Sequence, residues 1–193
     1  MAIEWDSSGV LPKVIGSGLA IGEQSPFRVT LLDVADLFVV SKERLDIFRG
    51  FINYRKALHE TGICEGFQWI NGSFVEDVEV FRGTPPHDID IVTFTYLPKD
   101  CNDQHDLYSR HPELFDPTQT KAKYRVDGYL ELLGQPMTVK MVHKVTYWHN
   151  LWSHQRGSFA EKGFVELDLS PEEDSSADVI LKMKEKEMQN GQK

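Results

Sequence analysis

The sequence predicts an α/β fold of the α+β kind, a small mixed β-sheet flanked by helices, in one domain over residues 1–193. Two segments, 66–70 and 88–95, resemble core strands and are joined by turn-forming Gly, Ser and Pro. Other segments repeat apolar residues at intervals of three and four, which is the period of amphipathic helices. Strands interspersed with helices favour a sheet on which the helices pack.

Length and composition permit a substantial core and exclude several classes of protein. A chain of 193 residues with 40% hydrophobic residues is ordinary for a globular domain. Its formal charge of -9, from 30 acidic and 21 basic residues, argues against a broad nucleic-acid-binding surface. Because no apolar run approaches the roughly 18 residues of a membrane span and no signal peptide is apparent, we expect a cytoplasmic protein without membrane contact.

The first part of the chain is expected to be a loop followed by a short helix. Residues 1–27 are rich in Gly, Ser and Pro, which predicts an N-terminal loop segment. Thr30, with Asp33 three positions later, is a helix-capping signal. A helix over residues 31–39 should follow.

A stronger helix should begin at Ser41, run to about residue 60 and end at Gly62. Arg55 and Lys56 lie off its apolar stripe, so they are expected to face solvent or to approach the turn at residues 72–73. The residues of the stripe recur at intervals of three and four. They are Leu45, Phe48, Phe51, Ile52 and Leu58.

The strand that opens at Asp88 carries the most informative pattern. Side chains alternate faces along a strand, so Asp88 and Asp90 point to one side, and Ile89 and Ile91 point to the core. Two carboxylates this close repel each other unless a cation lies between them. A divalent cation that prefers hard oxygen ligands, Mg²⁺ or Mn²⁺, fits this requirement.

A Gly72-Ser73 turn precedes a short acidic segment and offers backbone N–H groups and a hydroxyl to an anion. Such a pair is usually a plain turn. The carboxylate strand behind it favours the alternative interpretation, in which Gly72 and Ser73 bind the terminal phosphates of a nucleotide.

A later strand, over residues 123–133, offers a third carboxylate. Asp127 should share a face with Arg125, Tyr129 and Glu131, while Val126, Gly128, Leu130 and Leu132 point the other way. Asp is disfavoured in strands, so its presence here calls for a functional reason.

A helix is expected over residues 137–153. Lys140 and Lys144 are four positions apart and share one of its faces, where they would hold triphosphate oxygens or form a plain solvated pair. In the loop that follows, His154 and Arg156 would contact an acidic substrate. The Met and Trp stripe of this helix is expected to be core. Its residues are Met137, Met141, Val145, Trp148 and Trp152.

The remaining segments are assigned from turn residues and short patterns. Ser170 and Pro171 predict the start of a C-terminal helix that runs to about residue 187, with a frayed tail after it, so that 171–193 form a helix and tail. Other expected elements are loops over 98–104 and 117–120, a short helix over 107–114 and a strand over 164–169.

The two cysteines are interpreted as reduced thiols. Cys64 and Cys101 are far apart and lie in no CxxC pattern. Cys101, Asp103 and His105 fall short of the four closely spaced ligands of a structural zinc site.

Gly72-Ser73 followed by Asp88-Ile89-Asp90 resembles the signature of polymerase-β-type nucleotidyltransferases. That superfamily adds a third carboxylate from a later strand, which Asp127 matches. The chain also resembles a bacterial family of small nucleotidyltransferase-like proteins in an ordered set of blocks that covers most of its length. These are Arg55, GFQWINGSFVEDVE, PHDIDIVTF, YRVDGYLELL and YWHNLWSHQR.

Two features depart from the superfamily pattern. Asn71 stands where a hydrophobic residue is usual before Gly-Ser. The segment after the turn is acidic, with Glu76, Asp77 and Glu79, and Arg82 is its only cation.

The resemblance implies a nucleotidyltransferase-like fold and a metal-dependent reaction. Asp88, Asp90 and Asp127 would hold two Mg²⁺ (or Mn²⁺) ions, and Gly72 and Ser73 would orient the phosphates. The enzyme would transfer a nucleoside monophosphate from a nucleoside triphosphate such as ATP to a hydroxyl of a protein, an RNA or a small molecule. Relatives of this kind imply a bacterial toxin–antitoxin, defence or antibiotic-modification context.

Two alternatives remain open at this stage. One is a catalytically inactive protein with the same fold, such as an antitoxin-like partner of another protein, which the acidic segment after Gly72-Ser73 favours. The other is a metal-dependent phosphodiesterase, which would hydrolyse its substrate without transfer to an acceptor.

Overall fold

The computed structural model describes residues 3–20 and 22–190 and confirms the predicted fold class. In these residues five strands form one mixed sheet in the order β1-β5-β2-β3-β4. β2 is antiparallel to β5 and β3, whereas the pairs β1–β5 and β3–β4 are parallel. The strands are β1 (Phe27–Val29), β2 (Gly66–Asn71), β3 (Ile89–Thr95), β4 (Val126–Leu132) and β5 (Val165–Asp168).

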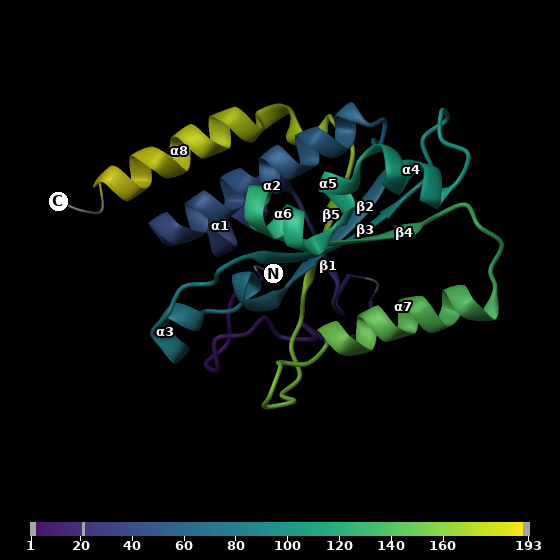
Figure 1. Cartoon of the computed structure of the whole chain (residues 1–193). Coiled ribbons are helices and arrows are strands. Elements are labelled where there is room, and N and C mark those ends of the chain that lie inside the picture. The colour runs from purple at the N-terminus through teal and green to yellow at the C-terminus, as the bar shows by residue number, and fades with distance from the viewer. Residues whose placement is uncertain (1–2, 21, 191–193) are drawn as a thin grey trace.

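Helices cover the two faces of the sheet unequally. Figure 1 shows α1, α2, α6 and α8 on one side and α7 on the opposite side. None of the helices in residues 3–20 and 22–190 is long and apolar enough to cross a membrane. The helical elements are α1 (Leu31–Phe38), α2 (Lys42–Glu60), η1 (Gly72–Val75), α3 (Val78–Arg82), α4 (Gln104–Arg110), α5 (Pro112–Phe115), α6 (Pro117–Tyr124), α7 (Val139–Trp152), η2 (Glu173–Ser176) and α8 (Ala177–Asn190).

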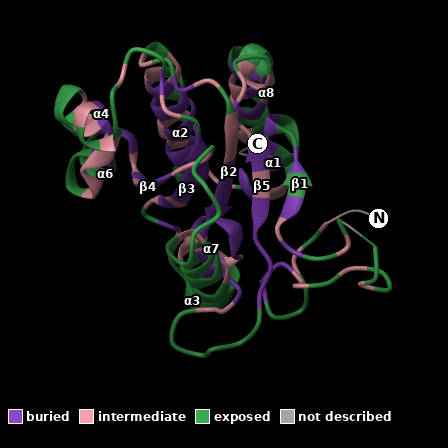
Figure 2. Cartoon of the chain, turned by 90° about the vertical axis from the view of Figure 1, so that its right-hand side faces the viewer, coloured by how far each residue is buried: buried purple, intermediate pink, exposed green. Residues whose placement is uncertain are grey.

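The main core lies between the sheet and α1 and α2. The strands and the inner sides of these helices are buried, as Figure 2 shows in purple. The predicted alternation holds, since Ile89 and Ile91 are fully buried on this face. Burying apolar side chains stabilises the fold by about 25 cal/mol per Å² removed from water. All five residues of the predicted α2 stripe belong to this core: Leu45, Phe48, Phe51, Ile52 and Leu58.

Local signals for α1 and α2 are confirmed. Thr30 and Asp33 form a capping box in which each side chain accepts from the other residue's backbone N–H. Ser41 caps α2, and its hydroxyl accepts a hydrogen bond from the Arg44 backbone. Gly62, with φ of 85°, lies just beyond the end of α2.

The expectation that Arg55 faces solvent or the turn at residues 72–73 is wrong, although Lys56 is exposed. Arg55 is fully buried, with its guanidinium 2.7 Å from Asp174 Oδ1. It also donates to Gln68 Oε1 and to the Asp168 carbonyl. Its partners come from segments distant in the sequence, which helical periodicity cannot identify.

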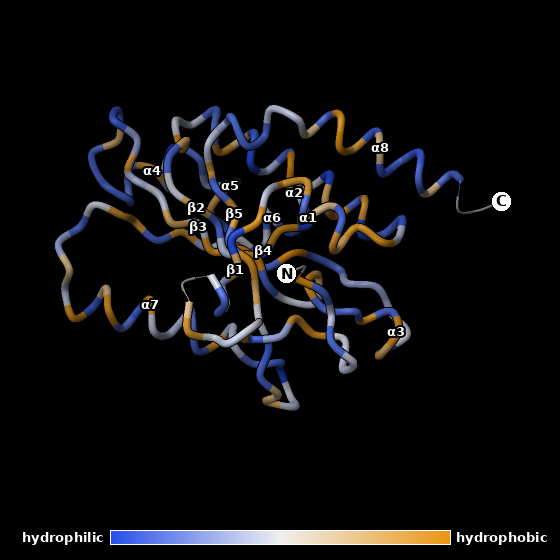
Figure 3. Tube along the Cα trace, turned by 180° about the vertical axis from the view of Figure 1, so that it is seen from behind, coloured by the Kyte–Doolittle hydropathy of each residue, from blue (hydrophilic) through white to orange (hydrophobic). Residues whose placement is uncertain are grey.

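The predicted α7 stripe is confirmed only for Trp148 and Trp152. Trp148 and Trp152 pack with Trp69, Val92, Phe94 and Phe164 in a second, smaller apolar cluster. Met137 and Val145, however, are 88% and 38% exposed, and Met141 is partly exposed. The N-terminal part of α7 faces a pocket, which Glu131 of the sheet also lines. Apolar positions of α7 therefore remain at the surface (Figure 3).

Several smaller assignments need correction. Residues 117–120 form the first turn of α6, which Asp116 caps, so the strand predicted from 123 begins at Val126. The helix expected over 107–114 is two short helices, α4 and α5, and the C-terminal helix starts later than expected, after η2. Residue 27 belongs to β1, which was not predicted.

Some assignments extend beyond the described residues. Parts of the predicted N-terminal loop (1–2 and 21) and of the predicted tail (191–193) lie outside them. Within them, Cys64 and Cys101 are both free thiols, as expected.

Candidate active site

The register of β3 and β4 brings the three predicted carboxylates together. Asp90 and Asp127 are direct partners in this parallel pair, and Asp88 lies two positions before Asp90 on the same face. All three line one pocket of about 910 Å³ between the sheet and α7. Gly72 and Ser73 line the same pocket. The predicted grouping of these five residues is therefore present in the fold.

Arg125 fixes the relative position of the two strand starts. It adopts a left-handed conformation, with φ of 58°, that reverses the chain between α6 and β4. Its Nε donates to the His87 carbonyl at 3.0 Å, and its own carbonyl accepts from the Ile89 N–H at 3.0 Å. These bonds flank Asp88 and hold it beside the start of β4.

Lys121 is a member of the site that the sequence analysis missed. Its Nζ lies 2.7 Å from Asp127 Oδ2 and 3.2 Å from Asp88 Oδ2. The hydrogen bond to Asp127, and then the interaction with Asp88, raise the pKa of Lys121 above its usual value. Lys121 is thus an ammonium cation at neutral pH. The chain reversal at Arg125 places α6 beside β4. No pattern in the sequence predicted this reversal.

Asp90 is the carboxylate whose charged form is least favoured by its surroundings. Burial, followed by the charges of Asp88 and Asp127, raises the pKa of Asp90 to about 6. Asp127 also carries a buried oxygen, Oδ1, that has no hydrogen-bond partner in the described part of the chain. Both features indicate carboxylates that lack a sufficient counter-charge.

Gly72 is required by both its conformation and its surroundings. Its φ of 78° is in the left-handed region, and a Cβ at this position would overlap Oδ2 of Asp90. Asn71, the preceding residue, pairs with Asp90 across β2 and β3. The turn therefore lies directly against the carboxylate strand.

We expect Gly72→Ala to lower the free energy of unfolding by about 2–3 kcal/mol, because it combines backbone strain with overlap. Gly83→Ala is the matched control: its φ of 69° is similar, but no atom lies within 4 Å of the added Cβ. Urea denaturation of both variants separates the two contributions. Equal losses in the two variants would mean that the contact with Asp90 is not tight.

The acidic segment after the turn is neutralised by distant cations in addition to its own Arg82. Glu76 is 4% exposed, and its carboxylate accepts from Lys162 at 2.5 Å and from Arg82 at 2.6 Å. Burial alone would raise the pKa of Glu76, but Lys162 and its hydrogen bonds hold it below the usual value. Glu79 pairs with the buried Arg44. The negative charge near the pocket is consequently smaller than the sequence suggests.

The helix α7 and the loop after it supply the far wall of the pocket. His154 and Arg156 line this pocket. Gln155 donates to Glu76 at 2.9 Å and links this loop to the segment after Gly72.

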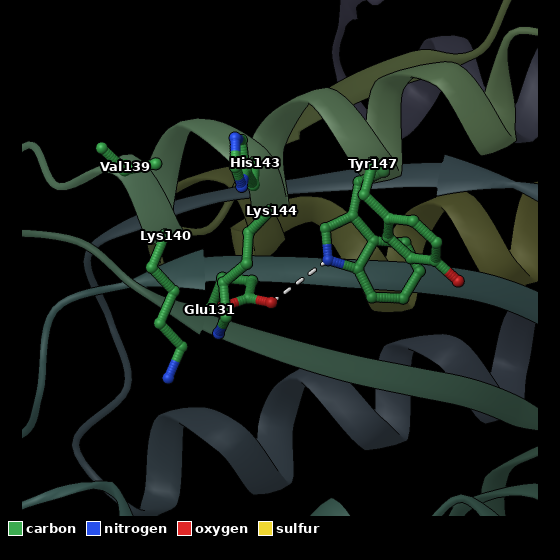
Figure 4. Close-up of a pocket in the computed structure, with 7 residues that line it drawn as sticks. Glu131, Val139, Lys140, His143, Lys144 and Tyr147 are labelled. Carbon is green, nitrogen blue, oxygen red and sulfur yellow. Dashed lines mark hydrogen bonds and ion pairs between the residues drawn. The ribbon is translucent and has the colours of Figure 1, made fainter.

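Lys140 and Lys144 do not line the carboxylate pocket. They line a smaller neighbouring one of about 580 Å³, where Lys144 forms an ion pair with Glu131 (Figure 4). Trp148 Nε1 donates to the other Glu131 oxygen at 3.2 Å. Lys144 therefore balances a local charge in this arrangement and is not free to bind a phosphate at the three aspartates.

A metal site is not preformed around the carboxylates. Within residues 3–20 and 22–190, no three Asp, Glu, His or Cys side chains are arranged to hold a metal ion as they stand. Lys121 provides the positive charge next to Asp88 and Asp127 instead.

Comparison with known proteins gives one match. Searches of curated proteins and of solved structures find no significant similarity. A family model matches residues 3–168, which include the whole sheet, the three aspartates and the Gly72-Ser73 turn. The chain therefore belongs to the family described as a family of unknown function (DUF6932).

Proposed function

We propose that this protein is a metal-dependent nucleotidyltransferase that moves a nucleoside monophosphate from a nucleoside triphosphate to a hydroxyl of a protein, an RNA or a small molecule. One observation carries the proposal. Three carboxylates from two parallel strands meet in one pocket beside a glycine turn that only glycine can form. The resemblance of the same residues to the polymerase-β-type signature supports it.

The residues around the pocket fit a hard divalent cation. Asp127 Oδ1 and Asn71 Oδ1 are buried acceptors with no partner among the described residues, and both belong to residues that line the pocket. Such oxygens, beside the uncompensated Asp90, suit Mg²⁺ or Mn²⁺. When bound by Asp88, Asp90 and Asp127, the metal would stabilise the charge of the triphosphate and lower the pKa of the attacking hydroxyl.

The chain's own groups have separate tasks in this reaction. The Ser73 hydroxyl and the Arg156 guanidinium line the pocket and would hold phosphate oxygens. The acceptor oxygen forms a bond to the α-phosphorus, the bond to the bridging oxygen breaks, and pyrophosphate leaves. The Asp127 carboxylate, which lines the pocket, would accept the proton of the acceptor hydroxyl.

A thermal-shift assay tests the proposal. With ATP or GTP and Mg²⁺ at about 100 times the dissociation constant, the wild-type Tm should rise by about 5–10 °C. Asp88→Ala should remove this rise because the metal loses a ligand. Asp100→Ala, at a carboxylate that is 76% exposed outside the pocket, should retain it. Mass spectrometry of candidate acceptors after incubation with labelled triphosphates then identifies the transfer.

A specific observation favours a second candidate, a catalytically inactive binding protein. Lys121 already supplies a cation to two of the carboxylates, and no three-ligand metal group is preformed in the described residues. A Tm unmoved by every triphosphate and metal tested would support this candidate and contradict the first.

A further inference from the structure

Lys121 is bound to the two carboxylate oxygens that a shared metal ion would also need. Its Nζ lies 2.7 Å from Asp127 Oδ2 and 3.2 Å from Asp88 Oδ2. The shorter distance is typical of a charge-assisted hydrogen bond. An ammonium and a divalent cation cannot occupy the same position between these oxygens.

The side chain of Lys121 can also move away from the two carboxylates. Its side chain is 44% exposed, and a four-carbon stem allows the ammonium to swing into solvent while the α6 backbone stays in place. Lys162, the other lysine that lines the pocket, is different. Its side chain is 4% exposed and is held 2.5 Å from Glu76, so it is a fixed part of the wall.

The third carboxylate shows why one lysine is insufficient. Asp90 forms no ion pair within the described residues, although it is the direct β-sheet partner of Asp127. A single positive charge shared by Asp88 and Asp127 leaves the group of three carboxylates negative. A divalent cation would satisfy it better than Lys121 does.

We propose that Lys121 is a resident counter-ion of Asp88 and Asp127, which a divalent cation must displace in order to bind. The inference rests on the proposed function and adds a competitor to its metal site. In the metal-free protein Lys121 keeps two like-charged side chains together. Metal affinity is reduced by the need to break both ion pairs of Lys121.

Calorimetric titration of the metal-free protein with Mn²⁺ tests this inference, and it requires no turnover. Lys121→Met removes the competing charge but keeps an unbranched side chain, so it should bind Mn²⁺ about tenfold more tightly than the wild type. Lys123→Met is the matched control, since Lys123 lies on the same helix and forms no ion pair with these aspartates. Its Mn²⁺ affinity should equal that of the wild type.

Thermal unfolding in EDTA and in Mn²⁺ provides a second readout. Lys121→Met should have a lower Tm than the wild type in EDTA, because Asp88 and Asp127 lose their counter-charge. Addition of Mn²⁺ should raise the Tm of Lys121→Met by more than it raises the Tm of the wild type. Equal or weaker Mn²⁺ binding by Lys121→Met than by the wild type would overturn the inference but leave the proposed function standing. Absence of Mn²⁺ binding in all three proteins would overturn both.

Discussion

Replacement of Asp90 by Asn is expected to stabilise the metal-free protein at neutral pH and to reduce the proposed nucleotidyl transfer strongly. The pKa of Asp90 is raised from 3.8 to about 6 in the folded protein, first by burial and then by Asp88 and Asp127. The folded state therefore binds this proton more tightly than the unfolded state does. The corresponding stabilisation is full below pH 3.8 and is lost as the pH rises through 6.

The size of the effect follows from this difference in pKa, which corresponds to about 3 kcal/mol of unfolding free energy at pH 8. Asn at position 90 has no charge to bury. The free energy of unfolding of the variant should therefore exceed that of the wild type by up to about 3 kcal/mol at pH 8 and equal it near pH 4. If the proposed function holds, turnover should fall at least about 100-fold, because the proposed metal ion would lose a ligand.

Urea denaturation in EDTA between pH 4 and 8 measures the stability difference between the two proteins, in which the titration of groups that do not interact with Asp90 cancels. Asp100→Asn, at an exposed carboxylate, should follow the wild type throughout. A variant at position 90 that is less stable than the wild type at pH 8 would show that the Asp90 carboxylate makes favourable contacts. Retained transfer by the same variant would remove Asp90 from the reaction.

Features encoded in neighbouring residues could be predicted from the sequence. The capping box of Thr30 and Asp33 and the stripe of α2 depend on contacts three or four positions apart. The shared face of Asp88 and Asp90 follows from strand alternation alone. Asp127 was first singled out as a carboxylate in a predicted strand, and the resemblance to a known signature then grouped it with Asp88 and Asp90. The parallel register that places Asp127 beside Asp90 agrees with that grouping.

Features that depend on distant segments were missed. The positive charges beside the acidic segment come from Arg44 and Lys162, which precede and follow it by many residues. Lys121 reaches the site only because Arg125 reverses the chain. Helical periodicity also overestimated the burial of α7. The period of a helix shows which residues share a face, but it does not show whether another part of the protein covers that face.

Arg44 anchors the segment that follows the Gly72-Ser73 turn to α2. Its side chain is fully buried, and two of its nitrogens each lie 2.7 Å from an oxygen of Glu79. The guanidinium also donates to the carbonyls of Phe74 at 2.6 Å and Glu76 at 2.5 Å. Two carbonyls after the turn therefore accept from this one side chain, while the carbonyl of Val75 between them accepts from Trp5.

Arg44→Met is expected to lower the free energy of unfolding by about 3–5 kcal/mol, because it removes the cation from Glu79 and a hydrogen-bond donor from the buried carbonyls of Phe38, Phe74 and Glu76. Urea denaturation measures the loss. Arg49→Met on the same helix is the control: this arginine is 37% exposed and pairs with surface carboxylates, so its loss should be below about 1 kcal/mol. Comparable losses in the two variants would contradict an anchoring role. If the anchor also positions the turn, nucleotide-induced stabilisation of Arg44→Met should fall even at temperatures where the variant is folded.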